Sequence, residues 1–299
     1  MNDTPIKNKA GLTEEQFLQS YDASRYERPS VTVDMLIFTV ADEQEQNYRK
    51  LSPKSLQLLL VKRGDHPFMG QWALPGGFVS PDESLEEAAL RELQTETNID
   101  DIYLEQLYTW GEVDRDPRTR VISTSYMALV DSEKLEVKAG DDADDAKWFR
   151  IEDRWLRESK TATATGTVTE KWVELRLWNE AEELSATLKI TRTVNGRTVR
   201  EDREIVESRQ IAFDHARIIQ YALERLRGKI EYTDIAFALM PELFTLSELQ
   251  QVYEVILGKE LLAAAFRRKV ADKVIETNQY RKHAGHRPSK YYRFNPEWT

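Results

Sequence analysis

The stretch GGFVSPDESLEEAALRELQTETNI, residues 76–99, decides the fold of the middle of the chain. A glycine-rich loop passes directly into a run with helical periodicity. Ser84, followed three residues later by Glu87, forms a capping box that predicts a helix from about Leu85 to Thr97. The apolar residues that recur every four positions, and so form the stripe expected to pack on a sheet, are Leu85, Ala89 and Leu93.

The polar face of this predicted helix carries carboxylates. Glu92 and Glu96 are one turn apart and therefore lie on one face. Mg²⁺ takes oxygen ligands in an octahedron and often uses one or two carboxylates together with water and substrate phosphates. The pair therefore predicts a weak site for a divalent cation, because Thr95 offers no charge.

Strand-like segments lie on both sides of this helix. The runs SVTVDMLIFTV, residues 30–40, and SLQLLLVKR, residues 55–63, are rich in β-branched and aliphatic residues. Two more strands are predicted within residues 103–130, and another in DDAKWFRI, residues 144–151. This order predicts an α/β layer.

Residues 154–209 are less regular. Two extended runs flank Asn195-Gly196, a dipeptide that favours a two-residue hairpin turn, so a β-hairpin insertion is expected there. Residues 212–229 then show the spacing of an amphipathic helix, with Gly228 as the expected C-cap. His215, in the first turn of that helix, is expected to have a structural role.

Beyond Gly228 the pattern changes to short elements. Three helical segments are followed by two extended segments that are joined by a basic loop, which is the order of a winged helix-turn-helix. We therefore divide the chain of 299 residues into a domain of residues 1–228 and a second domain of residues 229–299.

Charge separates the same two parts. The whole chain has a formal net charge of −10, yet residues 258–299 contain ten basic and four acidic side chains. An acidic body thus carries a basic C-terminal module, which points to a nucleic-acid partner for that module alone.

Composition excludes several classes. The chain contains no cysteine, so disulfide frameworks and thiolate zinc sites are excluded. No apolar run approaches the roughly 18 residues that span a bilayer, and the start MNDTPIKNKAGLTEE is polar. We expect a cytoplasmic protein without a membrane partner.

The stretch from Gly77 to Ile99 resembles the Nudix box. That pattern is Gly, five residues, Glu, seven residues, Arg-Glu, an aliphatic residue, one residue, Glu-Glu, one residue, Gly and an aliphatic residue. Two positions depart from it, because Thr95 replaces the first Glu of the pair and Asn98 replaces the Gly. The positions that match in register are Gly77, Glu83, Arg91, Glu92, Leu93, Glu96 and Ile99.

The resemblance implies a role for each matched residue. In Nudix enzymes the glutamates hold divalent ions that activate water for attack on a pyrophosphate, which implies that Glu92, Glu96 and the carbonyl of Gly76 hold Mg²⁺ or Mn²⁺ here. Arg91 and Glu83 are then expected to brace the loop in a salt bridge. The departures at Thr95 and Asn98 leave it open whether the site is catalytic.

The flanking sequences resemble the Nudix-related transcriptional regulators of NAD metabolism, over residues 29–150 and 210–294. This family implies an α/β Nudix fold, a mixed sheet with flanking helices, followed by a C-terminal winged helix-turn-helix domain. It also implies ADP-ribose or a related NAD-derived nucleotide as ligand, a palindromic double-stranded DNA operator and a homodimer. Residues 154–209, with the β-hairpin insertion, lie outside the resemblance.

Arginines are the candidates to meet the diphosphate, because a guanidinium matches phosphate oxygens bidentately. A surface ion pair is the alternative for each of them. Trp72, Trp110 and Trp148 are assigned mainly to core packing, with stacking on adenine as the alternative. The ligand-binding candidates are Arg63, Arg115 and Arg118, together with Gly76 and Gly77 of the loop.

In the predicted recognition helix, the stripe Leu262, Phe266 and Val270 is expected to face the core of the second domain. Basic residues then turn outward, where they can reach base edges and phosphates in a major groove. The alternative is a solvated basic surface or a dimerisation module. The DNA-binding candidates are Arg267, Arg268 and Lys269 on the helix and His286, Arg287 and Lys290 in the wing.

Two functions follow. The first is a transcriptional regulator whose Nudix domain senses ADP-ribose or a related nucleotide and controls DNA binding by the winged helix. The second is a Mg²⁺-dependent ADP-ribose pyrophosphatase, supported by Glu92 and Glu96 in register.

Overall fold

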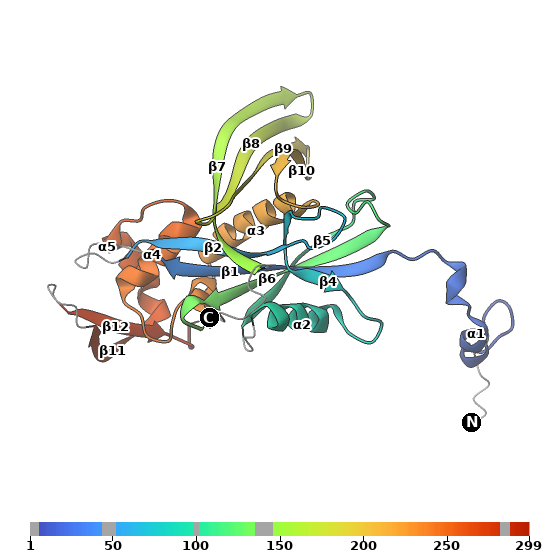
Figure 1. Cartoon of the computed structure of the whole chain (residues 1–299), viewed down its shortest axis with the longest axis horizontal. Coiled ribbons are helices and arrows are strands. Elements are labelled where there is room, and N and C mark those ends of the chain that lie inside the picture. Colours follow the sequence, from blue (N-terminus) through green and yellow to red (C-terminus); the bar gives the residue numbers. More distant parts are fainter. Residues whose placement is uncertain (1–5, 44–51, 98–101, 135–145, 282–287, 299) are drawn as a thin grey trace.

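The structure, a computed structural model, describes residues 6–43, 52–97, 102–134, 146–281 and 288–298. Its centre is a mixed sheet in the order β10-β9-β8-β7-β2-β1-β6-β5, with β3 paired to β2 and β4 to β1 (Figure 1). Strands β1 and β6 pair in parallel, whereas the other described pairs are antiparallel. The first strands are β1 (Ser30–Asp42), β2 (Lys54–Lys62), β3 (Trp72–Ala73), β4 (Gly76–Phe78), β5 (Tyr103–Trp110) and β6 (Val121–Asp131).

Strand β1 lies at the centre because its apolar run is covered on both faces. Alternate side chains of a strand point to opposite faces, so Leu36 and Phe38 join one hydrophobic cluster while Met35 and Ile37 join the other. The four residues are fully buried. This confirms the predicted strand.

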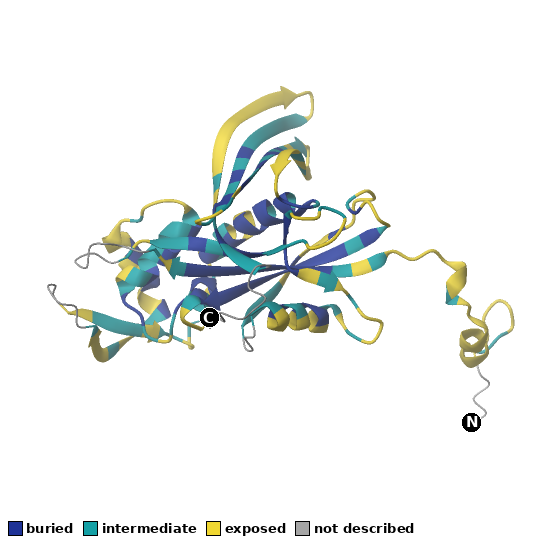
Figure 2. Ribbon diagram, viewed as in Figure 1, coloured by how far each residue is buried: buried dark blue, intermediate teal, exposed yellow. Residues whose placement is uncertain are grey.

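Two helices cover the faces of the sheet. Helix α2 (Leu85–Thr97) lies on one face and buries Ala88, Ala89 and Leu93, whereas α3 (His215–Ile230) covers the other (Figures 1 and 2). The Ser84–Glu87 capping box is present, because each backbone N–H donates to the other side chain. The structure thus confirms the α/β Nudix arrangement.

Residues 154–209 form more regular structure than the sequence predicted. They continue the central sheet as four long strands, β7 (Ala146–Thr163), β8 (Gly166–Trp178), β9 (Glu183–Asn195) and β10 (Thr198–Arg209). The hairpin between β9 and β10 is confirmed, but its two-residue turn is Gly196-Arg197, one residue later than predicted, because Asn195 still pairs with Thr198 and only Gly196 has a positive φ, of 57°. The start of β7 was predicted within residues 144–151, but its continuation to Thr163 and the strand β8 were not; the continuation of β7 consists of exposed residues without apolar alternation.

Helix α3 does not end at Gly228, which corrects the expected C-cap. It continues to Ile230, whose side chain is fully buried, and Glu231 occupies the C-cap. Burial of Ile230 stabilises one more turn than the local signal of a glycine would suggest. Consequently the helix runs without a break across the expected domain boundary.

The C-terminal region is a compact winged helix. The N-terminal capping box of α4 at Thr245 and Glu248 is confirmed, and its C-cap Gly258 has a φ of 65°. Leu262 is 81% exposed, so the expected stripe on α5 is wrong at that position, because Leu262 precedes the helix as its N-cap. The elements are η3 (Ile235–Leu239), α4 (Leu246–Leu257), α5 (Ala263–Val270), η4 (Ala271–Lys273), β11 (Val274–Arg281) and β12 (Ser289–Phe294).

An N-terminal arm precedes the sheet. Its helix α1 (Glu14–Ser20) contains no buried residue, and Figure 1 shows it projecting from the end of the molecule opposite the winged helix. Two short 3₁₀ helices, η1 (Ala23–Arg25) and η2 (Ser132–Lys134), complete the described elements. No helix among the described residues is long and apolar enough to cross a membrane.

Candidate functional site

The glycine loop lies directly against β1 and α2. Gly76 and Gly77 pair with Asp34 and Val33, and a Cβ added at Gly76 would overlap the carbonyl oxygen of Val33. A Cβ at Gly77 would overlap the carboxylate of Glu92. Gly76 therefore needs glycine for close approach to the β1 backbone, whereas Gly77 brings the loop against the side chain of Glu92 on the acidic face of α2.

That face brings together the two predicted carboxylates. Burial, and secondarily the charge of Glu92, raises the pKa of Glu96 above its ordinary value. Carboxylate and carbonyl oxygens are the donors that Mg²⁺ and Mn²⁺ prefer, and binding of such an ion by Glu92, Glu96 and the Gly76 carbonyl stays a prediction. The described residues contain no cluster of three or more His, Cys, Asp or Glu side chains that could hold a metal ion.

Thr95 does not replace the missing carboxylate. Its side chain is exposed, and its hydroxyl donates to the carbonyl of Arg91 one turn earlier at 2.8 Å. The hydroxyl thus satisfies the backbone of its own helix. Asn98, the second departure from the Nudix box, lies outside the described residues.

The predicted brace between Arg91 and Glu83 is confirmed. Their ion pair measures 2.8 Å, and Arg91 also pairs with Glu92 at 2.5 Å and donates to the carbonyl of Phe78 at 3.2 Å. The hydrogen bonds that Glu83 accepts from Arg91 and from the backbone of Ser80 lower its pKa to about 2. Arg91 thus ties the glycine loop to α2.

Two of the candidate arginines lie near each other. Burial lowers the pKa of Arg63, and the positive charge of Arg118 lowers it further. The guanidinium of Arg63 lies 4.8 Å from the ring of Phe213, and that of Arg118 lies 5.7 Å from the ring of Phe78. Of the two rings, Phe78 is exposed, so Arg118 and Phe78 together offer a cation and an aromatic surface to an anion that carries a base.

Arg118 remains accessible although it is paired. Its side chain is 44% exposed, and it donates to Asp116 at 2.8 and 3.1 Å. Arg63 donates to the carbonyl of Pro67 at 2.6 Å.

Arg115 is placed differently from the other two arginines. Its side chain is 6% exposed and lies between Asp214 at 2.9 Å and Asp34 at 3.4 Å. Next to it, the Nδ1 atom of His215 accepts a hydrogen bond from the backbone N–H of Leu74 at 2.8 Å. Arg115 and His215 therefore hold structural contacts, and direct contact of Arg115 with a ligand stays a prediction.

Sequence reasoning missed two residues of this buried ion-pair group. Asp214 lies just before α3, where nothing in the local pattern distinguishes it from an ordinary N-cap. Asp34 offered a signal, because it is a lone carboxylate inside an apolar central strand. Such a residue needs a buried partner, which Arg115 and the hydroxyl of Ser123 supply.

The tryptophans follow the core assignment. Trp72 is fully buried and Trp110 is 5% exposed, so both are core residues, and Trp148 is partly buried against the α2 side. The Nε1–H of Trp110 donates to Ser125 at 2.6 Å.

The candidate DNA-binding face is partly described. Phe266 and Val270 turn inward, and Arg267, Arg268 and Lys269 are exposed, as the helix spacing predicted. Lys290 forms an ion pair with Glu276 across the wing. The wing candidates His286 and Arg287 lie outside the described residues.

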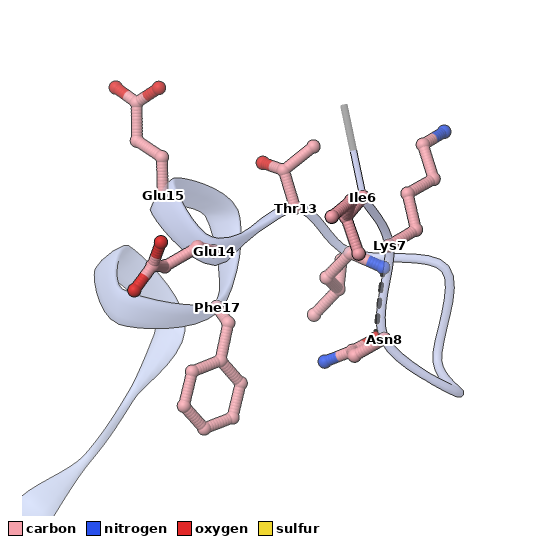
Figure 3. Close-up of a pocket in the computed structure, with 8 residues that line it drawn as sticks. Ile6, Lys7, Asn8, Thr13, Glu14, Glu15 and Phe17 are labelled. Atoms are coloured by element: carbon pink, nitrogen blue, oxygen red, sulfur yellow. Dashed lines mark hydrogen bonds between the residues drawn. The ribbon is translucent and has the colours of Figure 1, made fainter. Parts of the chain in front are cut away.

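Cavity size alone does not locate the site. A cavity of about 900 Å³ lies within the N-terminal arm and is lined by residues between Ile6 and Phe17 (Figure 3). A smaller cleft of about 430 Å³ lies beside the buried ion-pair group and is lined partly by Arg115, Asp214 and Arg217. The arm cavity holds none of the candidate residues, so we base the site on the conjunction of loop, carboxylates and arginines.

Fold and site together define a Nudix domain that is joined to a winged helix. The NUDIX domain family model matches residues 17–171, and the model of the NrtR DNA-binding winged helix domain matches residues 236–294. The ADPR-responsive transcriptional repressor NtrR of Acinetobacter baylyi is 34% identical over 285 residues, which cover 94% of this chain and 88% of that protein.

Two solved structures agree along most of their length. The first is the crystal structure of a MutT/nudix family protein from Enterococcus faecalis, with 28% sequence identity and a TM-score of 0.67. The match covers 97% of this chain and 100% of the Enterococcus faecalis chain. The crystal structure of Shewanella oneidensis NrtR complexed with a 27mer DNA is 31% identical, with a TM-score of 0.59, and covers 89% of this chain and 94% of that one. The chain belongs to the NrtR family of Nudix-related transcriptional regulators.

Proposed function

We propose that this chain is a ligand-responsive transcriptional regulator. Its Nudix domain binds ADP-ribose or a related NAD-derived nucleotide, and the ligand controls binding of the winged helix to operator DNA. The observation that carries this proposal is the likeness, along 94% of the chain, to a repressor named as ADPR-responsive. Such a regulator acts where the DNA is, which we take to be the cytoplasm.

The site chemistry supports a nucleoside diphosphate ligand. Arg63 and Arg118 offer two guanidiniums to a diphosphate, which also relieves their mutual repulsion. Phe78, 51% exposed, offers a ring for stacking. Gly76 and Gly77 bring the loop backbone close to β1 and to the carboxylate of Glu92.

A gel shift tests the regulatory proposal directly. The full chain is titrated onto DNA from upstream of its own operon, at several salt concentrations, with and without ADP-ribose. We expect binding that weakens with salt and that ADP-ribose changes. Absence of binding at low salt would sink the proposal.

Substitution of Arg268 by Ala tests the DNA-binding face. Removing one phosphate contact should lower the slope of log affinity against log salt by about 1. Arg154→Ala, on the β7–β8 extension and 66% exposed, is the matched control and should leave the slope unchanged.

A second candidate function is hydrolysis of the ligand. Two carboxylates share one face of α2, and Glu96 has a raised pKa. Mg²⁺ or Mn²⁺ held by Glu92, Glu96 and the Gly76 carbonyl would supply an activated water. Attack of water on phosphorus breaks one P–O bond of the diphosphate and releases AMP and ribose 5-phosphate. AMP release that depends on the metal and is lost in Glu96→Gln would establish this activity.

We also propose that the regulator is a homodimer and that the arm contributes to the contact. An isolated helix of seven residues is not stable in water, yet α1 buries nothing within its own chain. Phe17, Leu18, Tyr21 and Tyr26 are 43 to 62% exposed and offer an apolar surface to a second copy. Light scattering should give a dimer mass for the full chain and a lower mass after removal of residues 1–28. A monomeric full chain would exclude the proposal.

A further inference from the structure

Helix α3 contacts both the candidate nucleotide site and the winged helix. Its 16 residues span about 24 Å. Figure 1 shows it on the sheet face opposite α2, beneath the β7–β10 extension. A single rigid element therefore touches the two parts of the molecule whose functions must be linked.

The first turn of α3 is tied to both ligand-binding loops. The backbone N–H of Leu74, two residues before Gly76, donates to His215 Nδ1 at 2.8 Å. Asp214 pairs with Arg115, three residues before Arg118. These contacts are shielded from water, since the side chains of Arg115, Asp214 and His215 are 6 to 11% exposed.

The charge of a ligand in the nucleotide site acts on the ion pairs of Arg115 and Asp214. Hydrogen bonds from Arg118 lower the pKa of Asp116, and the nearby charge of Arg115 adds to the effect. A diphosphate at Arg118 therefore adds negative charge beside the Asp34–Arg115–Asp214 group. This changes the free energy of the ion pairs that hold the first turn.

The middle of α3 has no freedom to absorb such a change. Its inward side chains belong to the hydrophobic cluster of the central sheet, and Figure 2 colours much of the helix as buried. Close-packed interiors transmit displacement because they cannot deform continuously. The side chains that are at most 1% exposed are Ala216, Ile218, Ile219, Gln220, Ala222, Leu223, Leu226 and Ile230.

The last turns of α3 contact the winged helix. Arg227 Nε donates to the carbonyl of Ile256, in the last turn of α4, at 2.9 Å. The same guanidinium lies 2.5 Å from Asp153 of β7. Asp153 is 2% exposed, and its Oδ1 accepts no hydrogen bond from the described residues, so charge alone holds this ion pair.

Helix α4 in turn holds the recognition helix. Glu254 accepts from the backbone N–H of Leu261 at 2.8 Å, and Gln250 donates to the carbonyl of the same residue at 2.9 Å. The rings of Tyr253 and Phe266 pack at 5.2 Å. A shift of α4 therefore moves the start of α5, which carries Arg267 and Arg268.

We propose that α3 transmits nucleotide occupancy to the winged helix and that Arg227 is the positioning residue that couples α3 to α4. The inference rests on the proposed function, because it concerns how that ligand site controls DNA binding. Arg227 touches neither the candidate ligand site nor the outward face of α5, so its loss should remove coupling and spare both affinities.

The test compares Arg227→Met with Arg225→Met in the full chain. Arg225 lies on the same helix and is exposed, so the control removes the same charge from the same element. Calorimetry gives the affinity for ADP-ribose, and fluorescence anisotropy gives the DNA affinity with and without saturating ADP-ribose. In the wild type and in Arg225→Met, ADP-ribose should change the DNA affinity by about tenfold or more.

In Arg227→Met that factor should fall below about twofold, while each separate affinity stays within about threefold of the wild type. A coupling factor equal to that of the wild type would overturn the inference. If Arg227→Met does not fold, Asp153→Asn carries the test, since it removes the charge that holds the same guanidinium. Retained coupling in that variant also overturns the inference.

Hydrogen exchange separates failure of the inference from failure of the proposed function. ADP-ribose should slow or speed exchange at the end of α4, around Ile256, in the wild type but not in Arg227→Met. Exchange there that ignores bound ADP-ribose would refute transmission through α3, even where DNA binding still responds. If ADP-ribose does not bind at all, the proposed function fails instead.

Discussion

The two faces of the nucleotide site differ in how complete they are. On α2 two carboxylates remain and the third position of the Nudix pattern holds Thr95, whose hydroxyl is bonded to its own helix. Across the loop, the positive charges of Arg63 and Arg118 repel each other, with Arg118 beside exposed Phe78 and Arg63 beside Phe213. Anion recognition and metal-assisted hydrolysis thus depend on separate elements, which implies that ligand affinity and turnover can change independently.

The largest effect is expected from a substitution on the side of the site that holds Arg63 and Arg118. Arg118→Ala should weaken ADP-ribose binding about 10- to 100-fold, because charge-assisted hydrogen bonds to phosphate are lost and Asp116 is left without its partner. Calorimetry measures the affinity, and Arg154→Ala serves as an exposed, ion-paired control on the extension. An unchanged affinity would remove Arg118 from the site.

The next largest effect is expected from a substitution that restores a third carboxylate to the α2 face of Glu92 and Glu96. Thr95→Glu should raise the rate of AMP release by about tenfold or more, because a third carboxylate strengthens metal binding and charge stabilisation. Gln94→Glu adds the same charge at the neighbouring position and should not raise the rate. If the wild type already hydrolyses ADP-ribose at a rate that Thr95→Glu does not improve, Thr95 is not the reason for low turnover.

A smaller effect is expected from a substitution that lowers the free energy of unfolding through α2 and leaves the ligand affinity unchanged. Ser84→Ala removes the side-chain cap of α2 and should lower the free energy of unfolding by about 1 kcal/mol. ADP-ribose affinity should stay near that of the wild type, since neither arginine lies on α2. Denaturant unfolding measures the stability and calorimetry measures the affinity. A parallel loss of affinity would show that the faces are not independent.

The smallest effect concerns pH. The hydrogen bonds of Glu83 lower its pKa from 4.5 to about 2, so this group contributes stability above its unfolded pKa. That contribution disappears as pH falls from about 4.5 towards 2. Unfolding measured at several pH values should show a shallower loss in Glu83→Gln over this window than in the wild type. Identical slopes would mean that the brace to Arg91 does not contribute.

Local signals predicted much of the fold. The capping boxes at Ser84 and Thr245 appear where the sequence placed them, because each depends on contacts within a few residues. The hairpin turn lies one residue beyond the predicted Asn195-Gly196. The predictions were wrong where contacts between residues far apart in the sequence decide the end of a helix or the burial of a side chain. Burial of Ile230 carries α3 past Gly228, and Leu262 is exposed although its spacing predicted core packing.

The candidate site shows the same division. Spacing placed Glu92 and Glu96 on one helix face, and the resemblance to the Nudix box implied the pair of Arg91 with Glu83. Nothing in the chain order, however, brought Asp34, Arg115 and Asp214 together, because they are separated by up to 180 positions. A sequence pattern reports neighbours along an element, whereas a buried ion pair requires partners from different elements.

The sequence by itself determined the Nudix register, the loss of a carboxylate at Thr95 and the basic character of the C-terminal module, since these follow from residue type and spacing. Only the tertiary structure decided that Arg115 is buried, that Arg63 and Arg118 lie near each other, and that α3 joins the site to α4. The physical reason is that a charge acquires its role from the partners and the burial that folding provides.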